Sequence, residues 1–203
     1  MKEHYLFEVD PAKLPPELQS DAAMHRTSSQ GKLVAFGYSV LEKQGYFGAA
    51  TTMGANVRPL LTFSFLDYLM TLDLSGQTLI ELGAGNSTLL FQTLFRAVSS
   101  YETDERWFDH LKAKLLKKVE LNLCTTTELE AADISRATYD WMLVDFAGRR
   151  TQFIRNYFAT QPLANLPSYV ILDNSEWYRN GAAELAKVGY QEIPFFGMKT
   201  TQT

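Results

Sequence analysis

The run TLIELGAGNST at positions 78–88 constrains the fold of this chain more than any other segment. It starts as a short apolar stretch with a single charge, which is typical of a strand buried on both faces of a sheet. Gly83 and Gly85 follow at once, and glycine allows a sharp turn and a close approach of the backbone to a neighbouring group. Asn86 or Ser87 can then cap a helix whose first N–H groups favour a carboxylate or a phosphate. The run predicts a strand, a turn and a helix that together form a ligand pocket.

Apolar stretches of strand length alternate with stretches of helical length along the rest of the chain. Strands are expected at 78–83, 98–102, 119–124, 139–145, 168–173 and 190–196. Helices are expected at 58–70, 87–97, 104–118, 128–135, 149–161 and 176–188. Because parallel strands need crossover connections, this alternation predicts an α/β fold with a Rossmann-like, doubly wound and mostly parallel sheet. The last strand is expected to be short or missing.

The first part of the chain lacks this alternation. Prolines and glycines interrupt residues 1–57, and no helix or strand pattern is sustained there. We expect an N-terminal appendage at 1–57 and a sheet domain at 58–203, a division that suits a chain of 203 residues. Aromatic residues set among the glycines of the appendage either form a lid over a substrate or pack the appendage onto the sheet. These aromatic residues are Phe36, Tyr38, Tyr46 and Phe47.

Charge and cysteine content limit the partners of the chain. A net charge of −4 and a pI of about 5.4 argue against a sequence-independent nucleic-acid binder. The single cysteine, Cys124, permits no internal disulfide and fits a reducing compartment. No apolar leader and no run of about eighteen apolar residues occur, so we expect a cytoplasmic protein with no membrane partner. The expected partners are a small-molecule substrate and, if the short C-terminal end leaves the pocket incomplete, a second copy in a homodimer.

In an open parallel sheet, ligands bind at the carboxyl ends of the strands, so residues that end a strand are the candidates for chemistry. Glu102 ends the second predicted strand, 19 residues after Gly83, where a carboxylate can accept hydrogen bonds from both hydroxyls of a ribose. Thr88 stands where the dinucleotide-binding fingerprint has its third glycine or alanine, which argues against a pyrophosphate. The strand ends therefore indicate a nucleoside-type cofactor.

Four segments, GNSTLL, YETDERW, VDFAGRR and VILDNSEWY, are similar to a bacterial subgroup of the class I S-adenosylmethionine (SAM) dependent methyltransferases. The resemblance runs from about Arg58 to the C-terminus, and ELGAGNST resembles the first motif of that family. It implies that Glu81 and the glycine loop hold the methionine portion of SAM, that Glu102 holds the ribose, and that Asp145 lies beside the sulfonium. The implied cofactor-binding residues are Glu81, Gly83, Ala84, Gly85, Asn86, Ser87, Thr88, Glu102, Thr103, Trp107 and Asp145, of which Thr103 and Trp107 border the adenine.

The resemblance implies SAM-dependent methyl transfer (EC 2.1.1.-) to an oxygen or nitrogen of an unidentified small molecule. Asp145 and Asp173, at the ends of the fourth and fifth predicted strands, are the candidate catalytic residues. Together with Asn174 they offer hard oxygen ligands that suit Mg²⁺, as in the similar catechol-type O-methyltransferases. Those enzymes carry a lysine three residues after the first aspartate, where this chain has Gly148. The alternative is that Asp173 and Asn174 only turn the chain into the next helix.

Two other functions stay open. A SAM- or nucleotide-binding module that does not catalyse and acts with a partner is consistent with a short last strand. An NAD-dependent dehydrogenase is less favoured because of Thr88 and because the sequence offers no clear Tyr–Lys or His–Asp catalytic set. Binding of NAD would distinguish the dehydrogenase, and binding of SAM without methyl transfer would distinguish the module.

Two groups of basic residues have simpler interpretations. Arg149 and Arg150 open a predicted helix near the pocket and either bind an acidic substrate or contribute to surface solubility. Four lysines fall late in the helix expected at 104–118, where a solvated face that complements the helix dipole explains them. These lysines are Lys112, Lys114, Lys117 and Lys118.

Overall fold

The fold is taken from a computed structural model that describes residues 59–175 and 177–195. The chain divides into two compact units, the first formed by Met1–Asp73 with Pro194–Thr203 and the second by Leu74–Ile193. The appendage expected at 1–57, with its aromatic residues, lies outside the described residues. The boundary expected between 57 and 58 therefore stays a prediction.

The first unit contains one described helix, α3 (Phe63–Met70), which was expected over 58–70. The helix starts later because Thr62 is extended, with a ψ of 140°, and its carbonyl oxygen accepts the first helical hydrogen bonds, from Phe65 and Leu66. In the same unit, the ring of Phe195 lies 5.3 Å from that of Phe65 and 5.1 Å from that of Tyr68.

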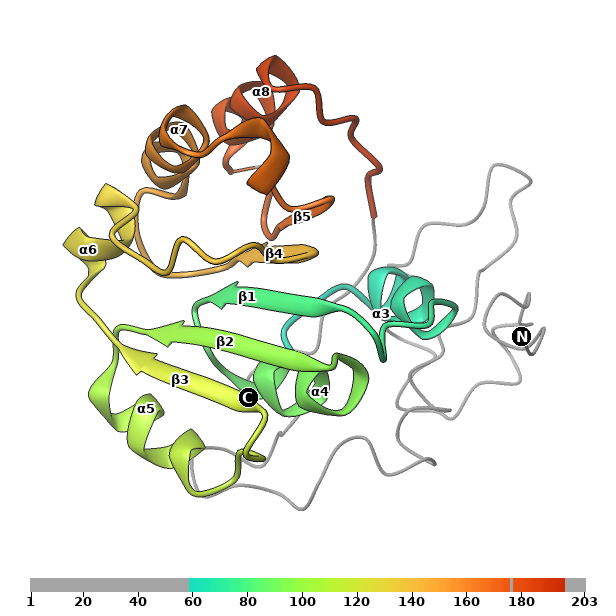
Figure 1. The fold of residues 1–203 in the computed structure, drawn as a ribbon, viewed down its shortest axis with the longest axis vertical. Coiled ribbons are helices and arrows are strands. Elements are labelled where there is room, and N and C mark those ends of the chain that lie inside the picture. The colour runs from blue at the N-terminus through green and yellow to red at the C-terminus, as the bar shows by residue number, and fades with distance from the viewer. Residues whose placement is uncertain (1–58, 176, 196–203) are drawn as a thin grey trace, which may run out of the picture. The chain divides into compact units, whose positions relative to one another are not determined.

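The second unit is built on a five-stranded sheet in which every pairing is parallel. The strand order is β3-β2-β1-β4-β5 (Figure 1). Strands β2 and β3 are added on one side of β1, and β4 and β5 are added on its other side. The strands are β1 (Thr78–Leu82), β2 (Ala97–Glu102), β3 (Val119–Leu123), β4 (Trp141–Val144) and β5 (Tyr169–Leu172). This topology confirms the Rossmann-like, doubly wound class expected from the sequence.

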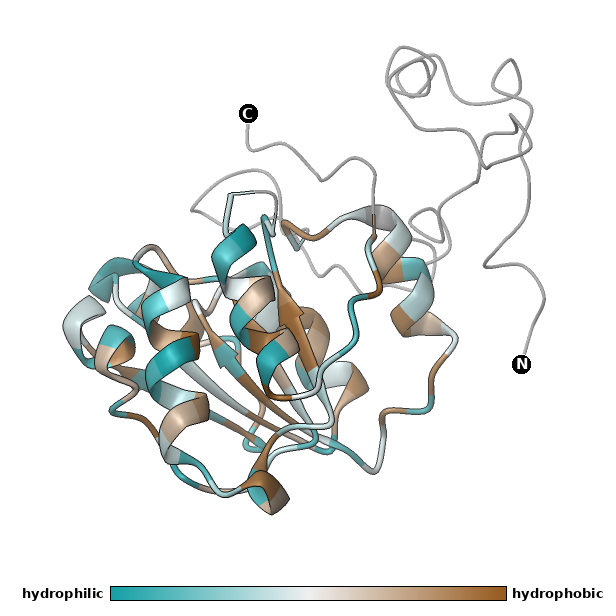
Figure 2. Ribbon diagram, turned by 90° about the horizontal axis from the view of Figure 1, so that it is seen from above, coloured by the Kyte–Doolittle hydropathy of each residue, from teal (hydrophilic) through white to brown (hydrophobic). Residues whose placement is uncertain are grey.

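Helices cover both faces of this sheet. They are α4 (Asn86–Leu94), α5 (Glu105–Lys112), α6 (Thr126–Ala131), α7 (Arg150–Thr160) and α8 (Arg179–Lys187), with a short 3-10 helix η3 (Leu163–Asn165) before β5. In Figure 1, α7 and α8 lie beside β4 and β5, whereas α4 and α5 lie beside β2 and β3. Figure 2 shows hydrophobic colour in the central strands and hydrophilic colour concentrated on the surrounding helices.

Alternate residues of the strands supply the two cores. On one face, Ile80 and Met142 are neighbours in the sheet and belong to a buried cluster with Phe153, Ile154 and Tyr157 of α7. On the other face, Leu79 is the neighbour of Trp141, whose ring lies 6.1 Å from that of Phe95 after α4. Because the central strands are buried on both faces, β4 is apolar at every position, and in β1 Glu81 is the only charged residue.

Several expected helices have different ends in the structure. The helix expected at 104–118 ends at Lys112, because the backbone N–H of Leu116 donates to the side chain of Gln92 at 2.9 Å and not to a helical carbonyl. The helix expected at 128–135 spans 126–131 and ends where Ala132 adopts a φ of 58°. The helix expected at 176–188 begins only at Arg179.

The strand expected at 190–196 is not present in residues 190–195, the part of it that the structure describes. The backbone N–H of Tyr190 donates to the carbonyl of Leu185 at 3.2 Å and closes the end of α8. Pro194 has no N–H to offer to a strand ladder. The expectation of a short or missing last strand therefore agrees with the described residues.

The turn after β1 depends on Gly83. Its φ is +97°, a backbone conformation that residues with a Cβ rarely adopt. Its N–H donates to the carbonyl of Tyr101 at 2.9 Å. A Cβ placed on Gly83 would lie 2.6 Å from the carbonyl oxygen of Asp145, at the end of the neighbouring strand β4. The glycine thus allows the ends of β1 and β4 to meet.

We expect Gly83→Ala to lower the free energy of unfolding by at least about 2 kcal/mol, because the new Cβ meets backbone and the conformation is strained. Gly76→Ala is the matched control, since a Cβ there meets nothing within 4 Å. Urea unfolding followed by circular dichroism measures both variants. Equal stability of the two variants would contradict this account of the turn.

Candidate functional site at the carboxyl ends of the strands

The loop between β1 and α4 leaves open space at Gly85. A Cβ placed on Gly85 would approach only the side chain of Ser87, at 4.0 Å, so neither packing nor backbone conformation requires glycine there. Gly85 is the N-cap of α4, and its N–H donates to the hydroxyl of Thr88 at 3.0 Å. The sequence placed the cap at Asn86 or Ser87, and this was wrong because Thr88 binds the residue before them. Gly85 offers room at the surface of the loop.

Glu81 lies beneath this loop, in the middle of β1, and its side chain is fully buried. Its carboxylate accepts hydrogen bonds from Ser87 at 2.5 Å, from Thr88 at 2.6 Å and from Ser100 at 2.6 Å. Ser87 and Thr88 belong to the first turn of α4, and Ser100 is the neighbour of Glu81 on β2. Glu81 therefore ties three elements together, and the structure gives it a supporting position under the loop.

Burial controls the protonation of Glu81. It raises the pKa of the carboxyl from 4.5 to about 7, and the negative charge of Glu102 adds to the increase. The three hydroxyl hydrogen bonds lower the pKa but do not cancel the effect of burial. Near neutral pH, the protonated and ionised forms of Glu81 are therefore both accessible.

Glu102 ends β2 directly beside the loop. The carbonyl of the preceding residue, Tyr101, accepts the N–H groups of Gly83 and Ala84, both at 2.9 Å. The Oε1 atom of Glu102 accepts the N–H groups of Thr103 and Asp104 at 2.7 and 2.8 Å. No described residue donates to Oε2, which is the oxygen that a ligand hydroxyl can use. Burial raises the pKa of Glu102 above its usual range, and the two backbone hydrogen bonds oppose that change.

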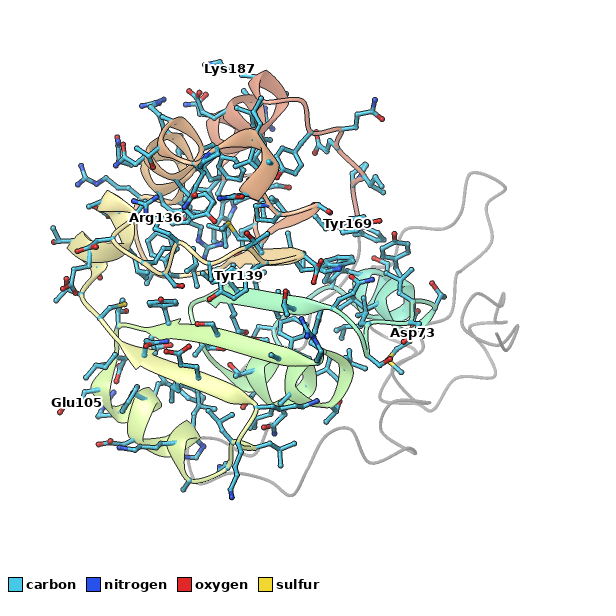
Figure 3. All side chains as sticks on the ribbon, viewed as in Figure 1. Asp73, Glu105, Arg136, Tyr139, Tyr169 and Lys187 are labelled. Atoms are coloured by element: carbon cyan, nitrogen blue, oxygen red, sulfur yellow. The ribbon has the colours of Figure 1, made fainter. Side chains whose placement is uncertain are left out.

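The residues after Glu102 form a wall next to it. Asp104 is the N-cap of α5, and its carboxylate accepts the N–H groups of Arg106 at 2.8 Å and Trp107 at 3.3 Å. This cap fixes the half-buried Trp107 one turn after Thr103, and its ring meets that of His110 at 5.5 Å. Figure 3 labels Glu105 at the start of the same helix. Glu102, Thr103 and Trp107 thus follow one another from the end of β2 into α5, and their roles toward a cofactor stay predictions.

Asp145 follows β4 on the other side of the loop and is paired with a buried cation. The Oδ1 atom of Asp145 lies 2.8 Å from Nη2 of Arg150, the first residue of α7. The same guanidinium donates to the carbonyl of Phe146 and to that of Asp173, each at 2.8 Å. The guanidinium also lies 4.8 Å from the ring of Tyr178. Because it binds Asp145 and Phe146 after β4 and Asp173 after β5, Arg150 joins the ends of these two strands.

Sequence reasoning did not find the role of Arg150. The side chain of Arg150 is 8% exposed and directed inward, whereas that of its neighbour Arg149 is 77% exposed and paired with Glu130 at 2.6 Å. Arg150 is therefore not available to bind an acidic substrate, whereas Arg149 has the exposed position that the surface alternative describes. The only available signal was the doublet itself, because consecutive residues at a helix start point about 100° apart and can face different environments.

The magnesium site expected at Asp145, Asp173 and Asn174 is not supported. Arg150 already supplies a positive charge to Asp145. Asn174 has a φ of 54°, and its carbonyl accepts the N–H of Trp177 at 2.8 Å, which is the geometry of a turn into α8. Nowhere in residues 59–175 and 177–195 do three His, Cys, Asp or Glu side chains gather as metal ligands would.

Gly148 occupies the place of the lysine in the catechol-type enzymes for a steric reason. A Cβ there would lie 2.7 Å from the ring of Phe146 and 2.8 Å from the methyl group of Thr126. A lysine could not enter this position without displacing both side chains. The neighbouring residues therefore exclude the base that the magnesium mechanism requires.

Among the solved structures similar to this chain are proteins described as methyltransferases or holding bound SAM or SAH. Fibrillarin from Aeropyrum pernix, with natively bound SAM, is 16% identical at a TM-score of 0.47, and the match covers 63% of this chain and 64% of fibrillarin. A dimethyladenosine transferase from Plasmodium falciparum is 15% identical at a TM-score of 0.42, over 57% of this chain and 43% of the transferase. A Streptococcus mutans protein described as a putative methyltransferase, in complex with SAH, is 14% identical at a TM-score of 0.42. The match covers 62% of this chain and 80% of that protein.

The likeness agrees with the fold class and carries no conclusion about activity, since the TM-scores lie below 0.5. The chain spans 64% and 43% of the first two proteins, which is less than two thirds of their length. One of the three is a dimethyladenosine transferase, so the comparisons lend no support to the expected exclusion of nucleic acid. No model of a known protein family matches the sequence, and no curated protein matches it either.

None of the helices within residues 59–175 and 177–195 combines the length and the apolar character that crossing a bilayer requires.

We expect Glu81→Gln to change how stability depends on pH. The pKa of Glu81 is about 7 in the folded protein and 4.5 for an exposed glutamate, the value expected in the unfolded chain. Between these two pH values, folded Glu81 keeps a proton that the unfolded chain has lost. Its contribution to stability therefore falls as pH rises from 4.5 to 7, with a slope of at most about 1.4 kcal/mol per pH unit. Glu81→Gln should remove this slope in urea unfolding measured across that range. The exposed carboxyl of Glu192, changed to Gln, is the control, and identical slopes in both variants would refute the assignment.

We expect Arg150→Met to lower the free energy of unfolding by about 3 kcal/mol, because it leaves Asp145 and two backbone carbonyls without their donor. Arg149→Met removes the neighbouring exposed ion pair and should cost less than about 1 kcal/mol. Urea midpoints of the two variants give the comparison. A larger loss for Arg149→Met would show that the cation of Arg150 is dispensable.

Proposed function

We propose that this chain is a SAM-dependent methyltransferase (EC 2.1.1.-) that methylates an oxygen or nitrogen of a small molecule. The observation that carries the proposal is the open face of Gly85 in the loop after β1, together with Oε2 of Glu102 at the end of β2, which accepts no hydrogen bond from the described residues. We propose the cofactor-binding residues expected from the sequence, from Glu81 to Asp145, as the residues that surround SAM.

The fit of SAM rests on two features of the chain. Gly85 has no packing reason to be glycine, so the space beside it is available to a ligand that passes close to the backbone. Glu102 holds one carboxylate oxygen in place with two N–H donors and keeps the other for a ligand, which suits the paired hydroxyls of a ribose. Glu81 supports the loop from below through its three hydroxyl partners.

When bound, SAM supplies a methyl group that is already electrophilic, so the protein has to align the acceptor and exclude water. Asp145 is the carboxylate best placed to accept a proton or a hydrogen bond from an acceptor, because Arg150 fixes one of its oxygens. Asp173 serves Arg150 through its backbone carbonyl, which favours a supporting role over the catalytic one expected from the sequence. The proposed methyl transfer proceeds without Mg²⁺, because Arg150 already supplies the positive charge beside Asp145.

The preference for a small molecule is supported by charge. Glu102, Asp145 and Asp173 lie at the carboxyl ends of three strands, and the guanidinium that pairs with Asp145, that of Arg150, is buried. A polyanion such as nucleic acid would meet these carboxylates, and the exposed guanidinium of the neighbouring Arg149 is already paired with Glu130. The cytoplasmic location and the homodimer stay predictions from the sequence.

Isothermal titration of the full chain with SAH, SAM and NAD, with and without EDTA, tests the proposal. We expect micromolar binding of SAH and SAM that EDTA does not change, and no binding of NAD. Gly85→Val should weaken SAH binding at least about tenfold, because the side chain fills the open space, while Gly76→Val serves as the matched control. Glu102→Gln should weaken it by about tenfold through loss of the charge.

Other outcomes point elsewhere. Binding of NAD in place of SAH would favour the dehydrogenase, and absence of all binding would overturn the cofactor assignment. SAH binding with no transfer of a labelled methyl group to any acceptor in a small-molecule panel would favour the non-catalytic module. Unchanged SAH affinity in Gly85→Val would remove the loop from the site.

A further inference from the structure

We propose that a groove at the amino ends of β2 and β3 is a second ligand site, which binds a small polyhydroxylated anion such as a sugar phosphate or a sugar acid. The groove is an open depression with a volume of about 410 Å³, which lies within the range of small-molecule sites. Its lining residues are Ala97, Val98, Ser99, Lys117, Lys118, Val119, Glu120 and Tyr139. This inference is independent of the proposed function.

The groove lies at the opposite end of the sheet from the loop between β1 and α4. Ala97 begins β2 and Glu102 ends it, so five residue steps of about 3.3 Å separate the two sites by roughly 17 Å. Val119 begins β3 beside Val98. Tyr139, labelled in Figure 3, comes from the segment between α6 and β4 and forms the other wall. A ligand here would not compete with one at the carboxyl ends of the strands.

The first observation is a buried hydroxyl whose hydrogen bonding is incomplete. Ser99 is 4% exposed, and its Oγ makes no hydrogen bond of normal geometry with the described residues, while its side chain interacts weakly with that of Tyr101. An unsatisfied buried hydroxyl is costly, and native structures usually pair such groups with protein, water or ligand. Because Ser99 lines the groove, a ligand hydroxyl is a suitable partner after a small movement of its neighbours.

The second observation is the arrangement of charge. Lys118 is held by the carbonyl of Phe95, to which its Nζ donates at 2.6 Å. Lys117 is exposed, and within the described part of the chain no residue accepts a hydrogen bond from it. Glu120 is the neighbour of Ser99 across the sheet, on the same face. The groove thus offers a free ammonium for an anion and, beside it, a carboxylate and a hydroxyl for ligand hydroxyls.

The termination of α5 at Lys112 is what brings these lysines to the groove. Had the helix continued to 118, Lys117 and Lys118 would lie on a helical face, as the sequence suggested. The segment after Lys112 instead leads directly into β3, and its last two lysines line the start of that strand. The basic residues therefore have a location that helical periodicity did not predict.

The test is a titration of the full ¹⁵N-labelled chain by NMR with ribose 5-phosphate, gluconate, inorganic phosphate and ribose as probes. We expect saturable shifts of the amides of Ser99, Lys117 and Val119 with ribose 5-phosphate or gluconate, with a Kd of about 1 mM or tighter. Ribose 5-phosphate and gluconate distinguish a phosphate from a carboxylate. Ribose and inorganic phosphate, which each lack half of the recognised groups, should bind more weakly.

Two variants and one control locate the site. Lys117→Gln should weaken binding at least about fivefold, and the same change at Lys112, which lies outside the groove, should alter it less than about twofold. Ser99→Ala should weaken binding about threefold with little change in the melting temperature, because the lost hydroxyl makes no hydrogen bond of normal geometry in the described protein. Absence of saturable shifts with all four probes, or equal effects of Lys117→Gln and Lys112→Gln, would overturn the proposal.

Discussion

The second unit depends on a buried carboxylate at its centre. Glu81 is fully enclosed in the middle strand, where an ionised or unpaired carboxyl would be strongly unfavourable. Three hydroxyls from β2 and α4 satisfy it, and in doing so they fix the start of α4 against the sheet. Without these hydroxyls the carboxyl could not be buried, and without the carboxyl the glycine turn would lose its support from below. One polar cluster therefore determines both the packing of the first βα unit and the shape of the proposed cofactor loop.

Arg150 has the corresponding role on the other side of the turn. It supplies a positive charge and three hydrogen-bond donors between the ends of β4 and β5. A metal ion could join carboxylates at the same strand ends, but a guanidinium already fills that electrostatic role and crowding at Gly148 excludes the lysine of the metal-dependent enzymes. The chemistry available at these strand ends is that of a carboxylate held in position by an internal cation.

Prediction from the sequence succeeded where local pattern and burial agree. Five strands were found near their expected positions, and β1, β4 and β5 are largely apolar segments. Glu102 was recognised as the end of a strand because strand order fixes the distance from the glycine turn to the next strand end. The helix boundaries were less accurate. The end of α5 depends on the side chain of Gln92, which is 24 residues away from Leu116 in the chain. No local pattern contains that contact.

The sequence alone determined the class of the fold and which residues end its strands, because hydrophobic periodicity and glycine placement act over short distances. Tertiary structure decided what those residues do. It placed Glu81 under the loop and Arg150 inside the site, and it gathered Ser99, Lys117 and Glu120 around a groove. These roles depend on which charges and hydroxyls meet across neighbouring elements, and that is set by the packing of the whole sheet with its helices.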